Sequence, residues 1–334
     1  MNRTIKLLSF VSVSLLFAFG RYPISWLLSS KRRASNIKKM SGGFYTYISS
    51  STGNVLHVRV SGNPKAQPLV LIHGANSSML QWYYQQLGLE DRYRLVMIDL
   101  PGHGLSAKAV DLSVNALAED LHNVITELSL GNVVLWGHSL GGMIVMEYCV
   151  QRFQPLPKAI MIQHCTYSNP LKTIVFSRLM KRIQQPVIVP FFNLVKKYPK
   201  VFRVLGYACY LNGLSLLFYR YLLFTGTQTA KELRFTSLLA ANTPAESVAE
   251  AILQTFKFER ENSLASIDVP CLIISGAADR ITKPIAGVNL QHRIVGSQLY
   301  QVAQGHFSMV ENSKQINTAV NDFLTSMDST ILLR

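Results

Sequence analysis

The chain is short of acidic residues in two long stretches. Residues 1–89 contain ten Lys or Arg and no Asp or Glu, and residues 148–231 contain twelve Lys or Arg and no Asp or Glu. The remaining segments hold all 18 acids against 11 bases, so the net charge of +15 comes from two regions only. Both regions are also rich in Leu, Phe, Tyr and Val, a mixture typical of surfaces that contact anionic bilayers. No RNP, zinc-finger or helix-turn-helix pattern accompanies the charge, so nucleic acid is the minor alternative as a partner.

Cysteine and charged residues are also scarce. The four cysteines show no CxxC motif and no regular spacing, and we expect free, buried thiols. No cluster with metal-ligand spacing is present, which predicts a protein without a metal or another cofactor. With 15% charged and 49% apolar residues in 334, the chain is neither disordered nor a polytopic membrane protein. A globular protein of enzyme size is the default expectation.

A long uninterrupted apolar run is missing as well. The longest near the N-terminus has 14 uncharged residues between Lys6 and Arg21. A helix of that length reaches only ~21 Å, short of the ~30 Å hydrocarbon core of a bilayer. A second apolar piece follows Arg21 and runs to the basic cluster that begins at Lys31.

Residues 1–40 are open to two interpretations. As a secretory signal, they would be cleaved at the small-x-small sequence that ends near Gly20, and the body would be exported. As an uncleaved anchor, the helix would continue past Arg21, whose side chain can reach the interface, with Trp26 at the headgroup level. The basic residues at positions 31–39 outnumber those at the front, which favours a single N-terminal transmembrane helix with the body in the cytoplasm.

From residue 44 the pattern is that of a sheet with helices. "FYTYIS" and "NVLHVRVSG" alternate in period two, as antiparallel strands do. "PLVLIHG", "YRLVMIDLPG", "NVVLWGHS", "KAIMIQHC", "PCLIISGAAD" and "SQLYQVAQGH" are apolar runs typical of buried parallel strands. Helical spacing marks "SVNALAEDLHNVITELSL", with Ser113 as its N-cap, "LGGMIVMEYCVQRF" and the closing "SKQINTAVNDFLTSM". Strands that alternate with helices predict an α/β fold with right-handed crossovers.

About a hundred residues interrupt this pattern between Cys165 and Pro270, with helical periodicity and no clear strand. A structureless loop of that length is implausible, so residues 166–264 are predicted to form an inserted helical cap, with residues 41–165 and 265–334 as the core. Seven aromatic residues of the cap suit an acyl chain, although each could simply pack helix against core: Phe191, Phe192, Tyr207, Tyr210, Phe218, Tyr219 and Phe224. Its basic residues Lys196, Lys197, Lys200 and Arg203 are predicted to face anionic headgroups.

"GHSLGG", residues 137–142, lies where a buried strand meets a helix. A serine in G-x-S-x-G occupies a strained strand-to-helix turn that exposes its oxygen at the carboxyl end of the sheet. This position predicts Ser139 as a nucleophile. The amide of Leu140, at the helix N-terminus, is the first predicted oxyanion donor.

A nucleophilic serine needs a base, and the base needs an orienting acid. Asp279 and His306 each follow a late strand, and either residue alone has a structural explanation as a cap or a surface histidine. Together they stand with Ser139 at three strand ends, in the chain order Ser, Asp, His. "MIQHCTYSN" offers no carboxylate after the preceding strand, which leaves Asp279 as the predicted acid.

The loop "LIHGANSS" is predicted to supply the second oxyanion donor, from the amide of Ala75 with Asn76 as second choice. His73 is expected to brace this loop, and Asp99 with His103 to tie together the loop of "DLPGHGLS". His138 is expected to point away from Ser139, and no pattern supports a role for His164.

As a set, "LIHGANSS", "DLPGHGLS", "GHSLGG", "GAADRIT" and "GHF" resemble the motifs of the α/β-hydrolase superfamily. The resemblance covers roughly residues 45–165 and 265–330. It implies an eight-stranded, mostly parallel sheet, a cofactor-independent hydrolase and a helical cap after the sixth strand. Ser139 departs from the epoxide hydrolase and haloalkane dehalogenase branches, whose nucleophile is aspartate. The apolar N-terminus with a cap is similar in architecture to membrane-bound monoacylglycerol lipases.

The sequence therefore predicts a serine hydrolase of carboxylic esters. Three interpretations stay open: a membrane-associated enzyme acting on lipids such as monoacylglycerols or lysophospholipids; a hydrolase of small esters or of carbon–carbon bonds; and a non-catalytic protein that binds a lipid or a protein.

Overall fold

A computed structural model describes residues 14–15, 17–31 and 42–331 of the chain. Eight strands form one sheet in the order β1-β2-β4-β3-β5-β6-β7-β8. Strand β2 runs in the opposite direction to the other seven strands, so the predicted eight-stranded, mostly parallel sheet is confirmed. The strands are β1 (Phe44–Ser49), β2 (Val55–Ser61), β3 (Pro68–Ile72), β4 (Arg94–Ile98), β5 (Val134–His138), β6 (Ala159–Gln163), β7 (Cys271–Gly276) and β8 (Gln298–Val302).

Strand β3 shows why the central runs are apolar at every position. Val70 and Ile72 join the core on one face of the sheet, and Leu69 and Leu71 join the core on the other face. All four are at most 1% exposed. A strand buried on both faces has no position for a polar side chain, so its sequence reads as a continuous hydrophobic run.

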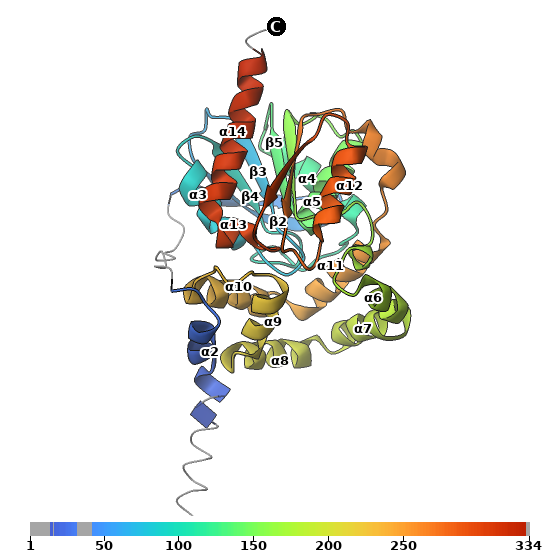
Figure 1. The fold of residues 1–334 in the computed structure, drawn as a ribbon. Helices are drawn as coiled ribbons and strands as arrows, with labels where there is room; N and C mark the ends of the chain where they lie inside the picture. The colour runs from blue at the N-terminus through green and yellow to red at the C-terminus, as the bar shows by residue number, and fades with distance from the viewer. Residues whose placement is uncertain (1–13, 16, 32–41, 332–334) are drawn as a thin grey trace, which may run out of the picture.

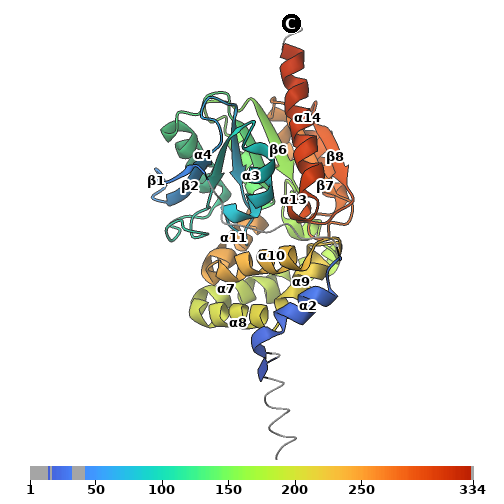
Figure 2. The same ribbon diagram turned by 90° about the vertical axis from the view of Figure 1, so that its left-hand side faces the viewer.

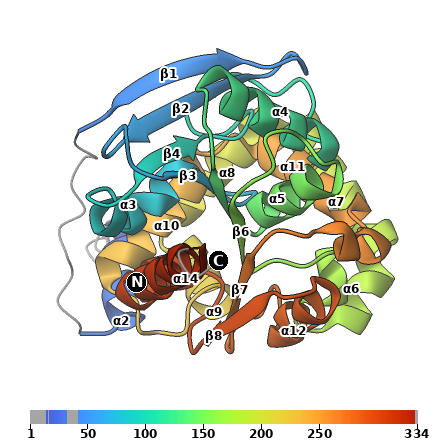
Figure 3. The ribbon, with the colours of Figure 1, turned by 90° about the horizontal axis from the view of Figure 1, so that it is seen from above.

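Helices cover both faces of the sheet (Figure 3). On one face lie α4 (Val114–Glu127), α5 (Leu140–Val150) and α12 (Pro284–Arg293); on the other lie α3 (Tyr83–Leu89), α13 (Ser308–Glu311) and α14 (Ser313–Ile331). Ser113 caps α4, as predicted, by accepting a hydrogen bond from the amide of Ala116. The patterns described above single out α4, α5 and α14 but not α3 or α12, which are short and carry weak apolar periodicity.

Six α-helices lie between β6 and β7 along the chain and form a layer at one end of the sheet (Figure 1). We call them the cap helices: α6 (Ser177–Ile183), α7 (Val189–Lys197), α8 (Pro199–Leu211), α9 (Leu214–Leu222), α10 (Ala230–Asn242) and α11 (Ala245–Lys257). Helix α10 begins with a capping box in which Thr229 and Glu232 bond each other's backbone amides. The layer covers the end of the sheet where residues 74–77, Ser139 and His306 meet side chains of α9 and α11.

A short helix near the N-terminus, α2 (Arg21–Leu27), packs against the cap helices α9 and α10 (Figure 2). Ser25 is fully buried there and accepts a hydrogen bond from Arg234. The carbonyl oxygen of Leu28 accepts from Arg220 Nε at 3.2 Å and from Gln228 Nε2 at 3.0 Å. The segment after Arg21, predicted to continue an anchor helix, therefore ends against the cap.

Most of the predicted apolar segment at 7–20 and most of the basic cluster at 31–39 lie outside the described residues. Among the residues that are described, we find no single helix with the length and apolar composition needed to cross a membrane. Helices α8 and α9 meet that condition only as a pair, and they are bent by 82° relative to each other.

Candidate active site

Ser139 sits on a strained turn between β5 and α5. Its φ of 54° and ψ of −116° are unfavourable for a residue with a side chain. The turn is possible because its glycines are small: a Cβ at Gly137 would lie 2.1 Å from the carbonyl oxygen of Gly141, and one at Gly141 would lie 2.2 Å from that of Ile72. The strain presents Ser139 at the carboxyl end of the sheet, as the motif predicts.

Asp279 and His306 are in direct contact. Asp279 Oδ2 lies 2.9 Å from His306 Nδ1, and both side chains are buried. The other carboxylate oxygen, Oδ1, accepts from the amides of Ile281 at 2.8 Å and Thr282 at 3.0 Å. Burial by itself would raise the pKa of Asp279, but the charge of His306 and the hydrogen bonds from His164 and His306 together hold it well below its usual range. Asp279 is therefore an ionised carboxylate that fixes the Nδ1 side of the imidazole of His306.

His164 also reaches Asp279, which the sequence did not indicate. It follows β6 directly, and its Nδ1 lies 3.1 Å from Asp279 Oδ2, a longer and less well aligned contact than that of His306. The available signal was its place at a parallel strand end, next to the ends of β5 and β7. No carboxylate directly follows β6 in the sequence, and the histidine that stands there belongs to no motif.

A cavity of about 200 Å³ joins the residues predicted to act together. Ser139, His306 and Ala75 line it, with Phe218, Tyr219 and Ile252 from the cap helices on the opposite side. Leu140 is the first residue of α5, where backbone N–H groups lack an acceptor within the helix. The predicted nucleophile, base and oxyanion loop thus share one mostly apolar cavity.

The loop that carries Ala75 is held by buried side chains. His73 Nδ1 donates to the carbonyl oxygen of Gly74 at 2.8 Å, while its Nε2 accepts from the amide of Leu100 at 2.9 Å. These two contacts define a neutral imidazole, and burial lowers the pKa of His73 to about 4. His103 Nε2 lies 2.7 Å from the carbonyl oxygen of Ala75. The bracing predicted for His73 is therefore present, and His103 contacts both its own loop, at the carbonyl oxygen of Pro101, and the loop of Ala75.

Asp99 ties neighbouring loops together, as predicted. Its Oδ1 accepts from the amide of Met79 at 2.7 Å, and its Oδ2 accepts from that of Leu105 at 3.0 Å. His57 Nδ1 also lies 2.9 Å from Oδ2.

The contacts of His138 indicate a structural role. Its Nε2 donates to the backbone carbonyl oxygen of His306 at 3.0 Å, and its ring lies 4.8 Å from the ring of His306. Burial, followed by the charge of His306, moves the pKa of His138 well below its usual value. It supports the loop of His306 as a neutral side chain.

The cap aromatics divide into groups. Phe218 and Tyr219 line the cavity of Ser139, and Phe192 lines a second cavity of about 220 Å³. Asn76 lines both cavities and donates to the hydroxyl of Tyr219 at 3.0 Å. Phe224 is buried against Phe307 instead. The remaining three, Phe191, Tyr207 and Tyr210, pack or bond within the cap and N-terminal region.

One group of side chains among the described residues could surround a metal ion. His164, Asp279 and His306 each offer a ligand atom within 4.8 Å of the others. Both histidine Nδ1 atoms, however, face the same oxygen of Asp279, and His306 Nδ1 is hydrogen-bonded to it as an N–H donor, so this nitrogen cannot ligate a metal. The cluster fits a hydrogen-bonded arrangement better than a metal site.

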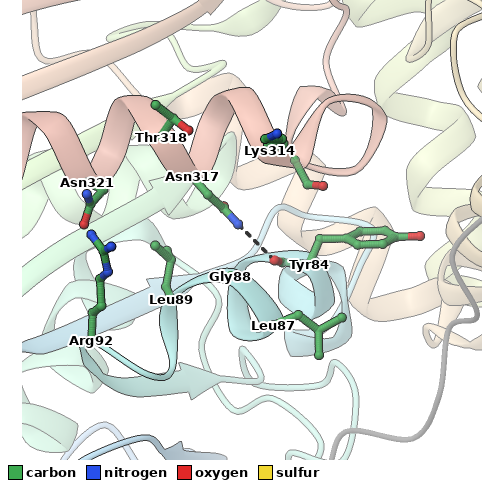
Figure 4. Close-up of a pocket in the computed structure, with 10 residues that line it drawn as sticks. Tyr84, Leu87, Gly88, Leu89, Arg92, Lys314, Asn317, Thr318 and Asn321 are labelled. Carbon is green, nitrogen blue, oxygen red and sulfur yellow. Dashed lines mark hydrogen bonds between the residues drawn. The ribbon is translucent and has the colours of Figure 1, made fainter.

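A separate hollow of about 440 Å³ lies between α3 and α14 (Figure 4). Asn317 donates there to the backbone carbonyl oxygen of Tyr84 at 3.0 Å, and Arg92 and Lys314 line the rim. None of its lining residues is His, Cys, Asp or Glu. It lacks the histidine and the carboxylate of a Ser-His-Asp triad and is not the candidate active site.

Comparison with known proteins agrees with this geometry. The family model described as alpha/beta hydrolase fold matches residues 67–313. The 3-oxoadipate enol-lactonase 1 of Acinetobacter baylyi is 22% identical over 295 residues, which are 84% of this chain and 97% of that protein. A thermophilic esterase from Thermogutta terrifontis superimposes with a TM-score of 0.70 at 19% identity, covering 85% of this chain and 99% of the esterase. A structure described as a membrane phospholipase A, a bacterial virulence factor, covers 97% of this chain and 95% of its own, with a TM-score of 0.67 at 20% identity. The chain belongs to the α/β-hydrolase fold family.

Proposed function

We propose that this protein is a serine hydrolase that cleaves carboxylic esters, with Ser139 as nucleophile, His306 as base and Asp279 as the orienting acid. The observation that carries the proposal is the 2.9 Å contact between Asp279 and His306 beside a cavity that Ser139 also lines. Ser139 and His306 line the same cavity and Asp279 contacts His306, which supports the roles of nucleophile, base and orienting acid.

The reaction proceeds by acyl transfer to water. His306 takes the proton of Ser139 as the serine oxygen attacks the ester carbonyl, and the amides of Leu140 and Ala75 stabilise the oxyanion. The tetrahedral intermediate expels the alcohol, which receives the proton from His306. Water, deprotonated by His306, then attacks the acyl group and releases the acid together with free Ser139. Asp279 stays ionised throughout and stabilises the positively charged imidazole.

The proposed substrate is a lipid ester such as a monoacylglycerol or a lysophospholipid. The cavity beside Ser139 is smaller than a typical ligand site of roughly 300–1,000 Å³, but Asn76 also lines the second cavity, which Phe192, Val195 and Phe202 surround. An acyl chain that passes Asn76 enters an apolar space between the cap helices. Opening this route requires Asn76 and Tyr219 to separate, since they are hydrogen-bonded.

A small ester is the second candidate, favoured by the size of the closed cavity, about 200 Å³. Hydrolysis of p-nitrophenyl esters from acetyl to oleoyl, together with monooleoylglycerol, separates the two. For a lipid substrate we expect kcat/KM to rise with chain length, and Asn76→Ala, which frees the passage, to raise it for long chains only. A maximum at acetyl in both proteins would contradict the lipid proposal and support the small-ester candidate.

The same cap offers a surface suited to a bilayer. Large apolar side chains are exposed on α2, α8 and α9, which lie at the end of the molecule opposite the end of α14 (Figure 1): Trp26, Leu27, Val201, Val204, Leu205, Leu214, Leu217, Phe218 and Tyr221. Exposed apolar patches of this kind mark interaction sites. We propose that this membrane face, defined by these nine residues, rests on the bilayer, that the N-terminal segment associates with the bilayer beside it, and that the catalytic body stays cytoplasmic. Export after cleavage near Gly20 is the alternative, which an intact-mass measurement would reveal as a shortened chain.

The basic residues assigned to headgroups need one correction. Lys196 forms an ion pair with Glu250, and Arg203 lines the second cavity. Lys197 and Lys200 are exposed near the membrane face and keep the proposed role.

Replacing Lys197 and Lys200 with glutamine is expected to weaken binding to vesicles of phosphatidylcholine and phosphatidylglycerol by roughly thirtyfold, at roughly 1 kcal/mol for each charge. Binding to pure phosphatidylcholine should change little. Vesicle flotation measures both. The matched control, Lys65→Gln with Lys108→Gln, removes the same charge from exposed positions in the core sequence and should bind as the wild type does. Equal losses in the two double variants would show that only net charge matters.

A further inference from the structure

Four buried side chains form a hydrogen-bonded chain from Trp136 to His164, and the Nδ1 atom of His164 faces Asp279. Trp136 Nε1 donates to Gln163 Oε1 at 2.9 Å, and Gln163 Nε2 donates to Ser308 Oγ at 2.9 Å. Ser308 Oγ lies 2.6 Å from His164 Nε2, and His164 Nδ1 lies 3.1 Å from Asp279 Oδ2. Each of these residues is at most 4% exposed, so water does not compete for the contacts.

The direction of this chain is determined by its first member. An indole nitrogen can only donate, so the atom of Gln163 that meets Trp136 must be the amide oxygen. The amide NH₂ of Gln163 then points to Ser308 and donates to Oγ. Among the described residues His164 Nε2 is the one other side-chain atom in hydrogen-bonding contact with Ser308 Oγ, so the hydroxyl proton of Ser308 goes to His164 Nε2. A nitrogen that accepts cannot carry the proton in a neutral imidazole. His164 is therefore protonated on Nδ1, the atom that faces Asp279.

The backbone around His164 is arranged for this contact. His164 has a φ of 47°, a left-handed conformation that non-glycine residues adopt rarely and often at functional sites. Its amide donates to the carbonyl oxygen of Ile274 in β7 at 2.9 Å, which holds the turn against the sheet. A Cβ at Gly276 would lie 2.9 Å from Cε1 of His164, so the glycine leaves the space that the ring occupies.

Asp279 Oδ2 thereby receives three side-chain contacts: Thr282 Oγ1 at 2.8 Å, His306 Nδ1 at 2.9 Å and His164 Nδ1 at 3.1 Å. The titratable groups around His164 are Asp279, His138 and His306. The ring of His164 lies 6.1 Å from that of His138 and 5.7 Å from that of His306. An N–H donor on His164 stabilises the negative charge of Asp279 together with His306. It also restricts the rotation of the Asp279 carboxylate.

We propose that His164 is a positioning residue for the reaction, held as an Nδ1–H donor by the Trp136–Gln163–Ser308 chain so that Asp279 keeps its orientation toward His306. The inference rests on the proposed function, because Asp279 is taken there as the orienting acid. His164 does not touch substrate. It acts through Asp279. The Trp136–Gln163–Ser308 chain, which we call the relay, contacts the Nε2 side of the ring and determines that the proton is on Nδ1.

Two substitutions separate this role from simple packing. In His164→Asn the amide nitrogen takes the place of Nδ1 and can still donate to Asp279, whereas in His164→Gln the longer side chain places its amide near Nε2 and leaves Asp279 one donor short. We expect kcat within a few-fold of the wild type for the Asn variant and a loss of roughly 10–100-fold for the Gln variant, since small misplacements of a catalytic group cost rate. KM should be unchanged in both. Packing predicts the opposite order, because Gln fills the space of histidine better than Asn.

The pH profile supplies a second readout. With one donor lost, Asp279 presents more negative charge to His306 and favours its positively charged form, so the acid limb of kcat/KM should move to higher pH in the Gln variant and stay in place in the Asn variant. Equal kcat values and coincident pH profiles for the two variants would overturn the proposal. Thermal unfolding of both proteins shows whether they are folded.

A measurement independent of activity tests the relay directly. In ¹⁵N-histidine NMR of the full-length protein in detergent, with assignment from the His164 variants, we expect the neutral Nδ1–H tautomer of His164 near pH 7. Ser308→Ala should remove this preference. Detection of the Nε2–H tautomer in the wild type would disprove the relay even for an active enzyme. If the wild type neither hydrolyses esters nor reacts with a fluorophosphonate, the proposed function fails, and the tautomer still decides whether the relay exists.

Discussion

Replacing Ser139 with alanine is expected to lower kcat for ester hydrolysis by at least about 10⁴-fold, since the acyl-enzyme can no longer form. Covalent labelling by a fluorophosphonate probe should be lost in the same variant. The backbone at Ser139 is already strained at a φ of 54°, and alanine meets the same strain, so the unfolding temperature should change little.

Ser266→Ala is the matched control for this experiment. Ser266 is exposed and donates to the carbonyl oxygen of Ser263 at 2.7 Å, and its removal should leave both labelling and turnover intact. Labelling that persisted in Ser139→Ala would place the nucleophile elsewhere. Absence of labelling in a folded wild type would support the non-catalytic interpretation of the sequence.

Mild acid is expected to destabilise the fold strongly because several buried histidines are held neutral. The pKa of His73 is lowered from 6.5 to about 4 in the folded protein, and those of His138 and His164 are lowered as well. Between these values the unfolded chain binds protons that the folded chain does not, so the free energy of unfolding falls as the pH falls. For His73 alone the loss is about 2 kcal/mol at pH 5, a sizeable part of a typical stability of about 5–15 kcal/mol.

Asp279 does not offset this loss. Its folded pKa lies below the unfolded value of 3.8, so its contribution is fully present above about pH 4 and is lost only in stronger acid. Two other carboxylates contribute at the acid end of the window: burial raises the pKa of Asp120, and the ion pair with Lys196 outweighs partial burial and lowers that of Glu250. The loss that belongs to a histidine is therefore measured by comparison with a histidine variant.

Urea unfolding at a series of pH values measures the effect. His73→Gln keeps an acceptor for the amide of Leu100 but cannot ionise, so it should be less stable near neutral pH and lose about 2 kcal/mol less on going to pH 5. His292 is exposed, and His292→Gln should follow the wild-type curve. Parallel curves for the His73 variant and the wild type would show that His73 is not the group that resists protonation.

Much of the fold could be predicted because its determinants are local. All eight strands were indicated: β3 to β7 by runs such as "PLVLIHG", in which burial on two faces leaves no polar position, and β1 and β2 by their alternation. The burial predicted for "SQLYQVAQGH" is wrong, because β8 lies at the edge of the sheet and of its residues only Val302 is buried. The elbow at Ser139 is encoded by Gly137 and Gly141, whose missing side chains permit the turn. Parallel strands end at one edge of a sheet, so residues that follow β5, β7 and β8 could be expected to meet.

Contacts between distant segments could not be predicted in the same way. Lys196 reads as one of several cap charges, yet Glu250 on α11 neutralises it, since α7 and α11 pack side by side. Helix α2 reads as part of an anchor, yet Ser25 and Leu28 bind the cap through Arg234, Arg220 and Gln228. Both sets of contacts depend on how the helices pack against one another. The apolar periodicity of a single segment does not predict that packing.

The sequence by itself determined the sheet, the strained serine turn and the order of Ser139, Asp279 and His306, because each depends on a local pattern or on the shared direction of parallel strands. Only the tertiary structure decided which side chains surround Asp279. His164 carries no motif, and its role comes from a chain that begins at Trp136 on β5 and passes through Gln163 and Ser308. Hydrogen-bond direction is a property of the assembled network, since the proton on His164 is set by an indole three side chains away.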